Sequence, residues 1–196
     1  MRTPVNIEGR ERQLIAATRR LFDEKGMQDA PVESIAREVG IARGLIYRQF
    51  SSKEELFVLT VTDYLAELAA SMEDAEGPEE VAEAFARFCV RYPAFVDSAL
   101  SIMQRPASEL RETVSESVWL RLGDGMASCI GPLEDALRDA GVADPGYTAN
   151  ALWTSGLGLM HLARLRVGLR RGPELFAIDA EEVVATCVQL TRALAS

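Results

Sequence analysis

The sequence has few of the residues that crosslink a secreted protein or bind a metal: three cysteines and one histidine in 196 residues. Cys89, Cys129 and Cys187 are odd in number and widely spaced. That pattern is no disulfide framework and no paired metal motif, and it is typical of a reducing cytoplasm. His161 is the only histidine, and the sequence offers no paired nucleophile and general base that could catalyse a reaction. We therefore expect no metal, no cofactor and no enzymatic activity.

Long apolar runs are also missing. No stretch approaches the roughly 18 uninterrupted apolar residues of a membrane span, and the first residues, MRTPVNIEGRERQ, lack the apolar run of a secretory signal. Hydrophobic residues nevertheless make up 48% of the chain and charged residues 26%, close to the average for soluble globular domains. The composition predicts a packed protein of the cytoplasm without a membrane partner.

Positive charge is scarce, since 21 Lys and Arg face 30 Asp and Glu for a net charge of -9. This balance argues against a protein that coats nucleic acid or anionic membranes by bulk charge. The deficit is uneven along the chain. Residues 1–50 hold nine basic and seven acidic residues (+2), whereas the remainder holds 12 basic and 23 acidic residues (-11). Such asymmetry suggests two parts with different partners.

Strand-like alternation is absent, and apolar residues recur with helical spacing almost throughout. Leu14, Leu21 and Phe22 share one face of a first helix, which Gly26 ends. Glu55 follows Ser52 by three residues, the spacing of a capping box at a helix start. Helices are expected at about 10–25, 31–39, 42–50, 53–74, 78–91, 93–104, 107–140, 145–170 and 179–194. The predicted class is all-α with about nine helices, and the 107–140 helix is expected to kink at its glycines or at Gly131-Pro132.

The two short helices expected at about 31–39 and 42–50 have the sequence features of a specific motif. Residues 32–50 read VESIAREVGIARGLIYRQF, with Ala36 four residues before Gly40 and Ile46 six residues after it. A helix-turn-helix needs a small residue where its helices approach, a glycine in the tight turn and an apolar anchor in the second helix. That second helix can then lie in the DNA major groove with its N-terminal residues at the base edges.

Over residues 10–57 the chain resembles the helix-turn-helix domain of TetR-type (tetracycline-repressor-like) bacterial transcriptional regulators. The family pattern is A-x-x-L-F-x-x-x-G, I-A-x-x-[AV]-G-[VI], G-x-[LIF]-Y-x-x-F and S/N-K-E-x-L. This chain has TRRLF before Gly26, then IAREVGI, GLIYRQF and SKEEL. The resemblance implies a helix-turn-helix DNA-binding domain over residues 1–50 and an effector-binding and dimerisation domain over residues 51–196. Pro31 and Ala42 depart from the family, which commonly has hydroxyl residues there.

Roles in DNA binding follow from side-chain chemistry and from the resemblance. Arg43 could pair bidentately with guanine, and Gln49 with adenine. Leu45 could touch a thymine methyl or belong to the core, and Arg48 could contact DNA or be a solvated surface charge. The resemblance implies that Tyr47 and Lys53 contact phosphates, which position the domain without specifying sequence. The predicted DNA-binding residues are Arg43, Gly44, Leu45, Tyr47, Arg48, Gln49 and Lys53.

An effector pocket in the acidic part would be apolar with a few polar groups. Each candidate could equally be a plain core residue, because aromatic and methionine side chains at helical spacing usually are. The candidate lining residues are Phe85, Phe88, Cys89, Tyr92, Met103, Trp119, Met126 and Trp153.

The resemblance also implies a homodimer, in which the last two long helices of each subunit form a four-helix interface. His161 lies in the first of them and could instead hydrogen-bond a ligand. A two-fold dimer would place two recognition helices about 34 Å apart, one helical turn of DNA. The candidate interface residues are Trp153, Leu157, His161, Val184, Cys187, Val188 and Leu194.

Taken together, the residues and the resemblance predict a ligand-responsive regulator that binds double-stranded DNA. We expect a repressor, released from a palindromic operator by a small apolar or amphipathic effector that shifts the protein between two conformations. The alternative is a helical ligand-binding or interaction protein without specific DNA binding. A helical enzyme is disfavoured by the lone histidine.

Overall fold

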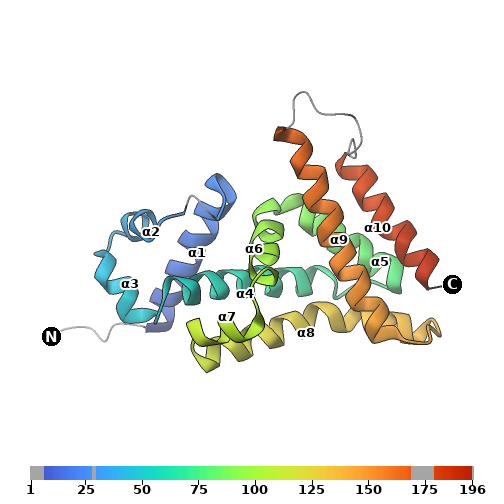
Figure 1. Cartoon of the computed structure of the whole chain (residues 1–196), viewed down its shortest axis with the longest axis horizontal. Coiled ribbons are helices and arrows are strands. Elements are labelled where there is room, and N and C mark those ends of the chain that lie inside the picture. The colour runs from blue at the N-terminus through green and yellow to red at the C-terminus, as the bar shows by residue number, and fades with distance from the viewer. Residues whose placement is uncertain (1–6, 28–29, 169–178, 196) are drawn as a thin grey trace. The chain divides into compact units, whose positions relative to one another are not determined.

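The computed structural model describes residues 7–27, 30–168 and 179–195, and within these ranges every regular element is an α-helix (Figure 1). The predicted all-α class is therefore confirmed. The ten helices are α1 (Ile7–Lys25), α2 (Val32–Val39), α3 (Arg43–Gln49), α4 (Lys53–Ser71), α5 (Pro78–Arg91), α6 (Pro93–Met103), α7 (Ala107–Thr113), α8 (Glu116–Asp139), α9 (Pro145–Gly168) and α10 (Ala180–Leu194). No helix in the described ranges combines the length and apolar character needed to cross a bilayer.

The chain forms two compact units. Unit 1 comprises the residues up to Tyr64 together with Asp97–Asp124, and unit 2 comprises Leu65–Val96 together with the residues from Gly125 onward. Helices α4, α6 and α8 contribute residues to both units. These units describe packing, and the functional boundary expected at residue 50 stays a prediction.

In unit 1 the helix-turn-helix is built on a small apolar core. Leu14 of α1, Ile35 of α2 and Ile46 of α3 are fully buried. Helix α2 ends at Gly40, whose φ of 72° lies in the left-handed region that glycine adopts without steric cost. The turn is closed by the Ile41 N–H, which donates to the Ala36 carbonyl at 2.9 Å. Pro31 and Ala42, at the starts of α2 and α3, provide no side-chain cap.

The start of α4 is linked to the corner between α7 and α8. The expected serine cap is present, since the Glu55 N–H donates to Ser52 Oγ at 2.9 Å, and Ser52 Oγ in turn donates to the Thr113 carbonyl at 2.7 Å. The expected return bond of a capping box is displaced by one residue. Glu55 Oε2 accepts from the Ser51 N–H at 3.0 Å, and its other oxygen accepts from Ser115 Oγ at 2.8 Å. The buried carboxylate therefore connects two corners of unit 1.

The single helix expected over 107–140 is wrong, because the chain forms α7 and α8 with a break at Val114 and Ser115. Val114 is extended (φ -127°, ψ 157°), and the Ser115 carbonyl accepts from the first turn of α8 at 3.0 Å. Helix α8 is continuous through its glycines and through Pro132, and the kink expected there stays a prediction. Gly125 instead permits close packing, because a Cβ there would lie 3.2 Å from Leu65 Cδ1.

Unit 2 is formed around α5, α9 and α10 with the second part of α8 (Figure 1). Helix α10 packs along α5 and against α9. It begins with a complete capping box, in which Asp179 accepts from the Glu182 N–H at 2.9 Å and Glu182 accepts from the Asp179 N–H at 2.8 Å. The buried core of unit 2 includes Phe85, Trp153 and Leu157.

Candidate DNA-binding surface and effector cavity

Helix α3 presents one face to the core and another to solvent. Ile46 is fully buried and holds the helix on α1 and α2, whereas Tyr47 next to it is 42% exposed. Arg43, Gly44 and Arg48 are also exposed, and Leu45 and Gln49 are half-buried. The predicted DNA-binding residues of α3 are therefore accessible in whole or in part, as contact with a groove requires.

Arg43 is already paired within the protein. Its guanidinium lies 2.5 Å from Glu33 Oε1 of α2, donates weakly to Tyr47 Oη at 3.5 Å, and lies 5.4 Å from the centroid of the Tyr47 ring. The hydrogen bond with Tyr47 and the charge of Glu33 raise the pKa of Arg43 above its usual value. Sequence patterns do not single out Glu33, because a contact between helices leaves no trace in spacing along one helix.

Lys53 occupies the first residue of α4. Its Nζ lies 4.6 Å from the centroid of the Phe57 ring, and Phe57 meets Phe22 edge to face at 4.9 Å. A lysine at a helix N-terminus adds its charge to the positive end of the helix dipole, an arrangement that favours anions. Lys53 is half-buried, so its aliphatic stem packs while its ammonium group can reach solvent.

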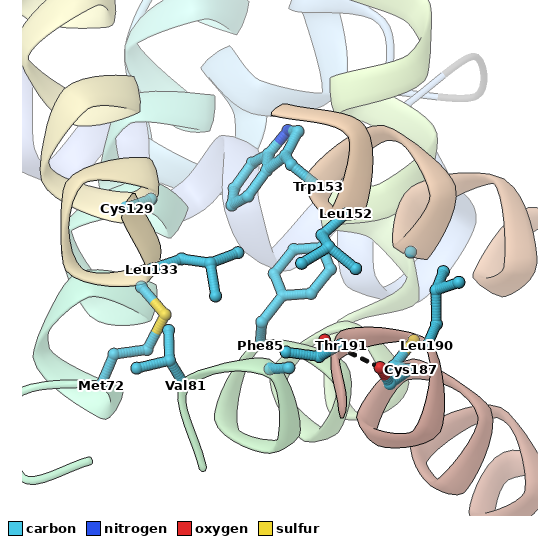
Figure 2. A pocket seen from close by; sticks show the side chains of 12 residues that line it. Met72, Val81, Phe85, Cys129, Leu133, Leu152, Trp153, Cys187, Leu190 and Thr191 are labelled. Atoms are coloured by element: carbon cyan, nitrogen blue, oxygen red, sulfur yellow. Dashed lines mark hydrogen bonds between the residues drawn. The ribbon is translucent and has the colours of Figure 1, made fainter. Parts of the chain in front are cut away.

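Unit 2 contains a small apolar cavity (Figure 2). The space open to a water-sized sphere is about 20 Å³, room for one water molecule. Phe85 and Trp153 meet in its wall with ring centroids 4.7 Å apart. The Thr191 hydroxyl, a rare polar group there, donates to the Cys187 carbonyl at 2.9 Å. The lining residues are Met72, Val81, Ala82, Phe85, Cys129, Leu133, Leu152, Trp153, Gly156, Cys187, Leu190 and Thr191.

Two of the eight predicted pocket residues, Phe85 and Trp153, line this cavity. Phe88 and Cys89 are buried in α5 outside its wall, and Met126 is half-buried in α8. The remaining three predicted residues lie elsewhere: Tyr92 donates to Glu67 at 2.5 Å, Trp119 is half-buried in unit 1, and Met103 of unit 1 is 47% exposed. Sequence reasoning missed aliphatic lining residues such as Leu133, which carry no signal beyond ordinary core spacing.

The predicted interface residues divide by exposure. Trp153, Leu157, Val184 and Cys187 are buried inside the single chain, and Trp153 and Cys187 line the cavity. Such side chains have little surface left for a partner. His161 and Leu194 are exposed, the latter at 45%, and Val188 is half-buried. The exposed members remain the candidates for a dimer contact.

The three cysteines are buried thiols of unit 2. Burial raises the pKa of Cys129 to about 12 and that of Cys187 to about 11, and it raises the pKa of Cys89 well above its usual value. Cys129 also donates to the Leu65 carbonyl at 3.2 Å. In the described ranges, no three His, Cys, Asp or Glu side chains are grouped so as to hold a metal ion. The thiols are therefore neutral core groups at physiological pH.

Gly156 explains how an aromatic ring reaches the cavity wall. A Cβ at this position of α9 would lie 2.6 Å from Cε1 of Phe85, far inside van der Waals contact. A Cβ at Gly158, two residues along the same helix, would meet no atom within 4 Å. The first glycine is thus required by packing, and the second is not.

The fold and the exposed face of α3 define the chain as a helix-turn-helix protein with an additional helical unit. Residues 14–59 match the family model described as "Bacterial regulatory proteins, tetR family". These residues contain the motifs that carry the resemblance to TetR-type regulators, and the match is limited to this segment of the chain.

Curated relatives match over only part of the chain. The transcriptional regulator HbdR of Aromatoleum sp. (strain CIB) is 37% identical over 62 residues, which is 32% of this chain and 27% of that protein. The regulator BetI of Escherichia coli (strain K12 / DH10B) is 41% identical over 59 residues, 30% of each chain. The aligned region thus spans less than a third of these relatives.

Solved structures resemble the chain over most of its length. Mycobacterium smegmatis BioQ superposes with a TM-score of 0.65 at 21% identity, covering 94% of this chain and 97% of that one. A TetR transcriptional regulator from Rhodococcus sp. RHA1 gives a TM-score of 0.60 at 19% identity, covering 95% and 97%. BioQ bound to its double-stranded DNA operator gives 0.59 at 18% identity, covering 91% and 98%. At such identities these likenesses concern the fold alone.

Proposed function

We propose that the chain is a ligand-responsive transcriptional regulator of the cytoplasm that binds a palindromic operator as a homodimer and acts as a repressor. The observation that carries the proposal is the position of Arg43 and Tyr47 on the exposed face of a helix anchored by buried Ile46. The family-model match over residues 14–59, which include this helix, and the partial similarity to the regulator HbdR support it. The alternative, a helical binding protein without specific DNA recognition, leaves this exposed basic and aromatic face without a role.

The effector we propose is small, uncharged and apolar. The cavity wall consists of aliphatic, aromatic and sulfur-containing side chains, and the Thr191 hydroxyl already donates within the chain. A charged molecule would lose its hydration there without a partner. Drug-sized ligands occupy pockets of about 300–1,000 Å³, so the cavity must widen when the effector enters. The effector can shift the conformational equilibrium only by preferring the wider state.

The test of the DNA-binding role uses Lys53→Ala in the full chain. If Lys53 contacts a phosphate, its loss should weaken binding to all DNA sequences alike and reduce the slope of log affinity against log salt by about one. Fluorescence anisotropy at several salt concentrations measures both. Arg91→Gln, an exposed arginine of unit 2, is the matched control. An unchanged slope in Lys53→Ala would remove this residue from the interface.

A further inference from the structure

A second hollow lies in unit 1, apart from the cavity proposed for the effector. Its apolar lining residues are Met27 after α1, Phe57 and Val58 of α4, Ile102 of α6 and Leu110 of α7. The space open to a water-sized sphere is about 150 Å³. An apolar cavity of about that size holds a benzene ring. This groove therefore already has room for a small organic molecule, whereas the cavity of unit 2 has room for one water.

The rim of the groove is polar and carries more positive than negative charge. Lys53 and Arg105 supply two cations, Glu54 supplies one carboxylate, and Ser101 adds a hydroxyl. Within the described ranges, neither cation has a carboxylate within the 4.0 Å of an ion pair. The Lys53 ammonium lies instead over the face of Phe57, at 4.6 Å. Two cations beside an apolar lining complement a molecule with one anionic end and one apolar end.

We propose that this groove binds a small carboxylate with an apolar body about the size of a six-membered ring. The carboxylate would pair with Arg105 and Lys53, and the body would cover Phe57 and Ile102. Arg105 is exposed and Lys53 is half-buried, so the hydrogen bond to Lys53 is the better shielded of the two, and the apolar body supplies further burial. The groove thus selects an anion, while the cavity of unit 2 selects a neutral molecule.

The consequence for DNA binding rests on the proposed function, in which Lys53 contacts a phosphate. A carboxylate that engages the Lys53 ammonium would compete directly with the DNA backbone for the same charge. The ligand would then act within the DNA-binding unit, with no conformational change transmitted from unit 2. Its effect would be equal on specific and non-specific DNA, because phosphate contacts carry no sequence information.

The first experiment measures binding without DNA, so that its outcome does not depend on the proposed function. Cyclohexanecarboxylate and its neutral isostere cyclohexanecarboxamide are titrated into the full chain by calorimetry. We expect saturable binding of one carboxylate per chain, with the amide at least about fivefold weaker. Arg105→Gln should weaken carboxylate binding by a similar factor, and Arg111→Gln, an exposed arginine of α7 outside the groove, should not. Equal binding of the two compounds, or no effect of Arg105→Gln, would overturn the proposal.

The second experiment measures DNA affinity with and without the carboxylate. In the wild type the carboxylate should weaken binding to specific and non-specific DNA alike, and in Lys53→Gln, whose DNA affinity is already lower, this effect should vanish. Carboxylate binding without any change in DNA affinity would refute the competition. If the chain binds no DNA at all while calorimetry detects the carboxylate, the proposed function fails and the groove stands.

Discussion

Arg43, the residue we propose to read a base, is held in place by a neighbouring carboxylate before any DNA binds. Glu33 pairs with its guanidinium at 2.5 Å on the exposed face of the helix-turn-helix, where phosphates would also approach. The carboxylate therefore has two effects that can be separated by experiment. It orients Arg43 beside Tyr47, and in the proposed complex it would repel the DNA backbone.

Replacing Glu33 by glutamine removes the charge and keeps the size of the side chain. We expect Glu33→Gln to raise affinity for all DNA by about two- to fivefold at low salt, because one repulsion is lost. Discrimination at the base read by Arg43 should fall, since the guanidinium is less well oriented. Glu24→Gln, an exposed carboxylate of α1, is the control. Identical behaviour of the two variants, measured by anisotropy on matched and mismatched DNA, would rule out a specific role for Glu33.

The buried thiols make a second residue-scale prediction. Because the pKa values of Cys129 and Cys187 are raised to about 12 and about 11, almost no thiolate is present in the folded protein at pH 8. A thiol-reactive dye should then label the folded chain at least about 100-fold more slowly than the urea-unfolded chain. Fast labelling of the native protein would show that a thiol is accessible.

The same groups affect stability at alkaline pH. An unfolded thiol ionises near pH 8.5, whereas the folded thiols stay neutral until much higher pH. The stability that the neutral buried thiols contribute is therefore fully present below about pH 8.5. It is lost as the pH rises toward the thiol pKa values of the folded protein, so the free energy of unfolding should fall over this range. The decline should be shallower in Cys129→Ala.

At the scale of the helix, Gly156 and Gly158 of α9 differ in how closely their neighbours pack against them. Gly156→Ala would place a methyl group against Phe85 and should destabilise the chain by about 1–3 kcal/mol through overpacking. Gly158→Ala meets no atom within 4 Å and should stabilise by about 0.5–1 kcal/mol, because alanine favours the helix. Urea unfolding of the two variants measures this contrast. Equal effects would mean that Phe85 moves aside without cost.

The elements themselves show what sequence reasoning could reach. Helix spacing located α2 and α3 correctly, because Ile35, Gly40 and Ile46 each satisfy a local requirement of the motif. The same reasoning missed the break before Ser115, since that serine is fixed by Glu55, 60 residues away in sequence. It also did not reveal that Gly125 of α8 permits close packing on Leu65. Local rules thus failed where a distant contact decides the conformation.

The candidate sites differ in the same way, since some are defined by local sequence and others by contacts between distant residues. The residues of α3 can be named from the sequence because a short motif places them at fixed positions along the chain, and their role in DNA binding stays a prediction. The cavity was found only in part, since its wall combines α5, α8, α9 and α10 and includes aliphatic residues that spacing cannot distinguish from core. The groove at Arg105 was missed entirely. Its cations come from α4 and from the turn between α6 and α7, and only the fold brings them together.

At the scale of the whole molecule, the charge distribution fits the proposed homodimer, in which two copies of a short helix-turn-helix bind DNA. The net charge is -9, yet residues 1–50 carry +2. A weakly basic DNA-binding domain should bind non-specific DNA with low affinity and depend on two half-sites for its affinity. The dimer is therefore essential to the proposed function.

Selection of DNA from a random pool by the full chain is the decisive measurement for a dimeric, sequence-specific regulator. We predict enrichment of a palindrome whose half-sites are centred about one helical turn apart, with binding to one half-site alone much weaker. The absence of any enriched sequence, or enrichment of a single unrepeated half-site, would contradict the proposed function.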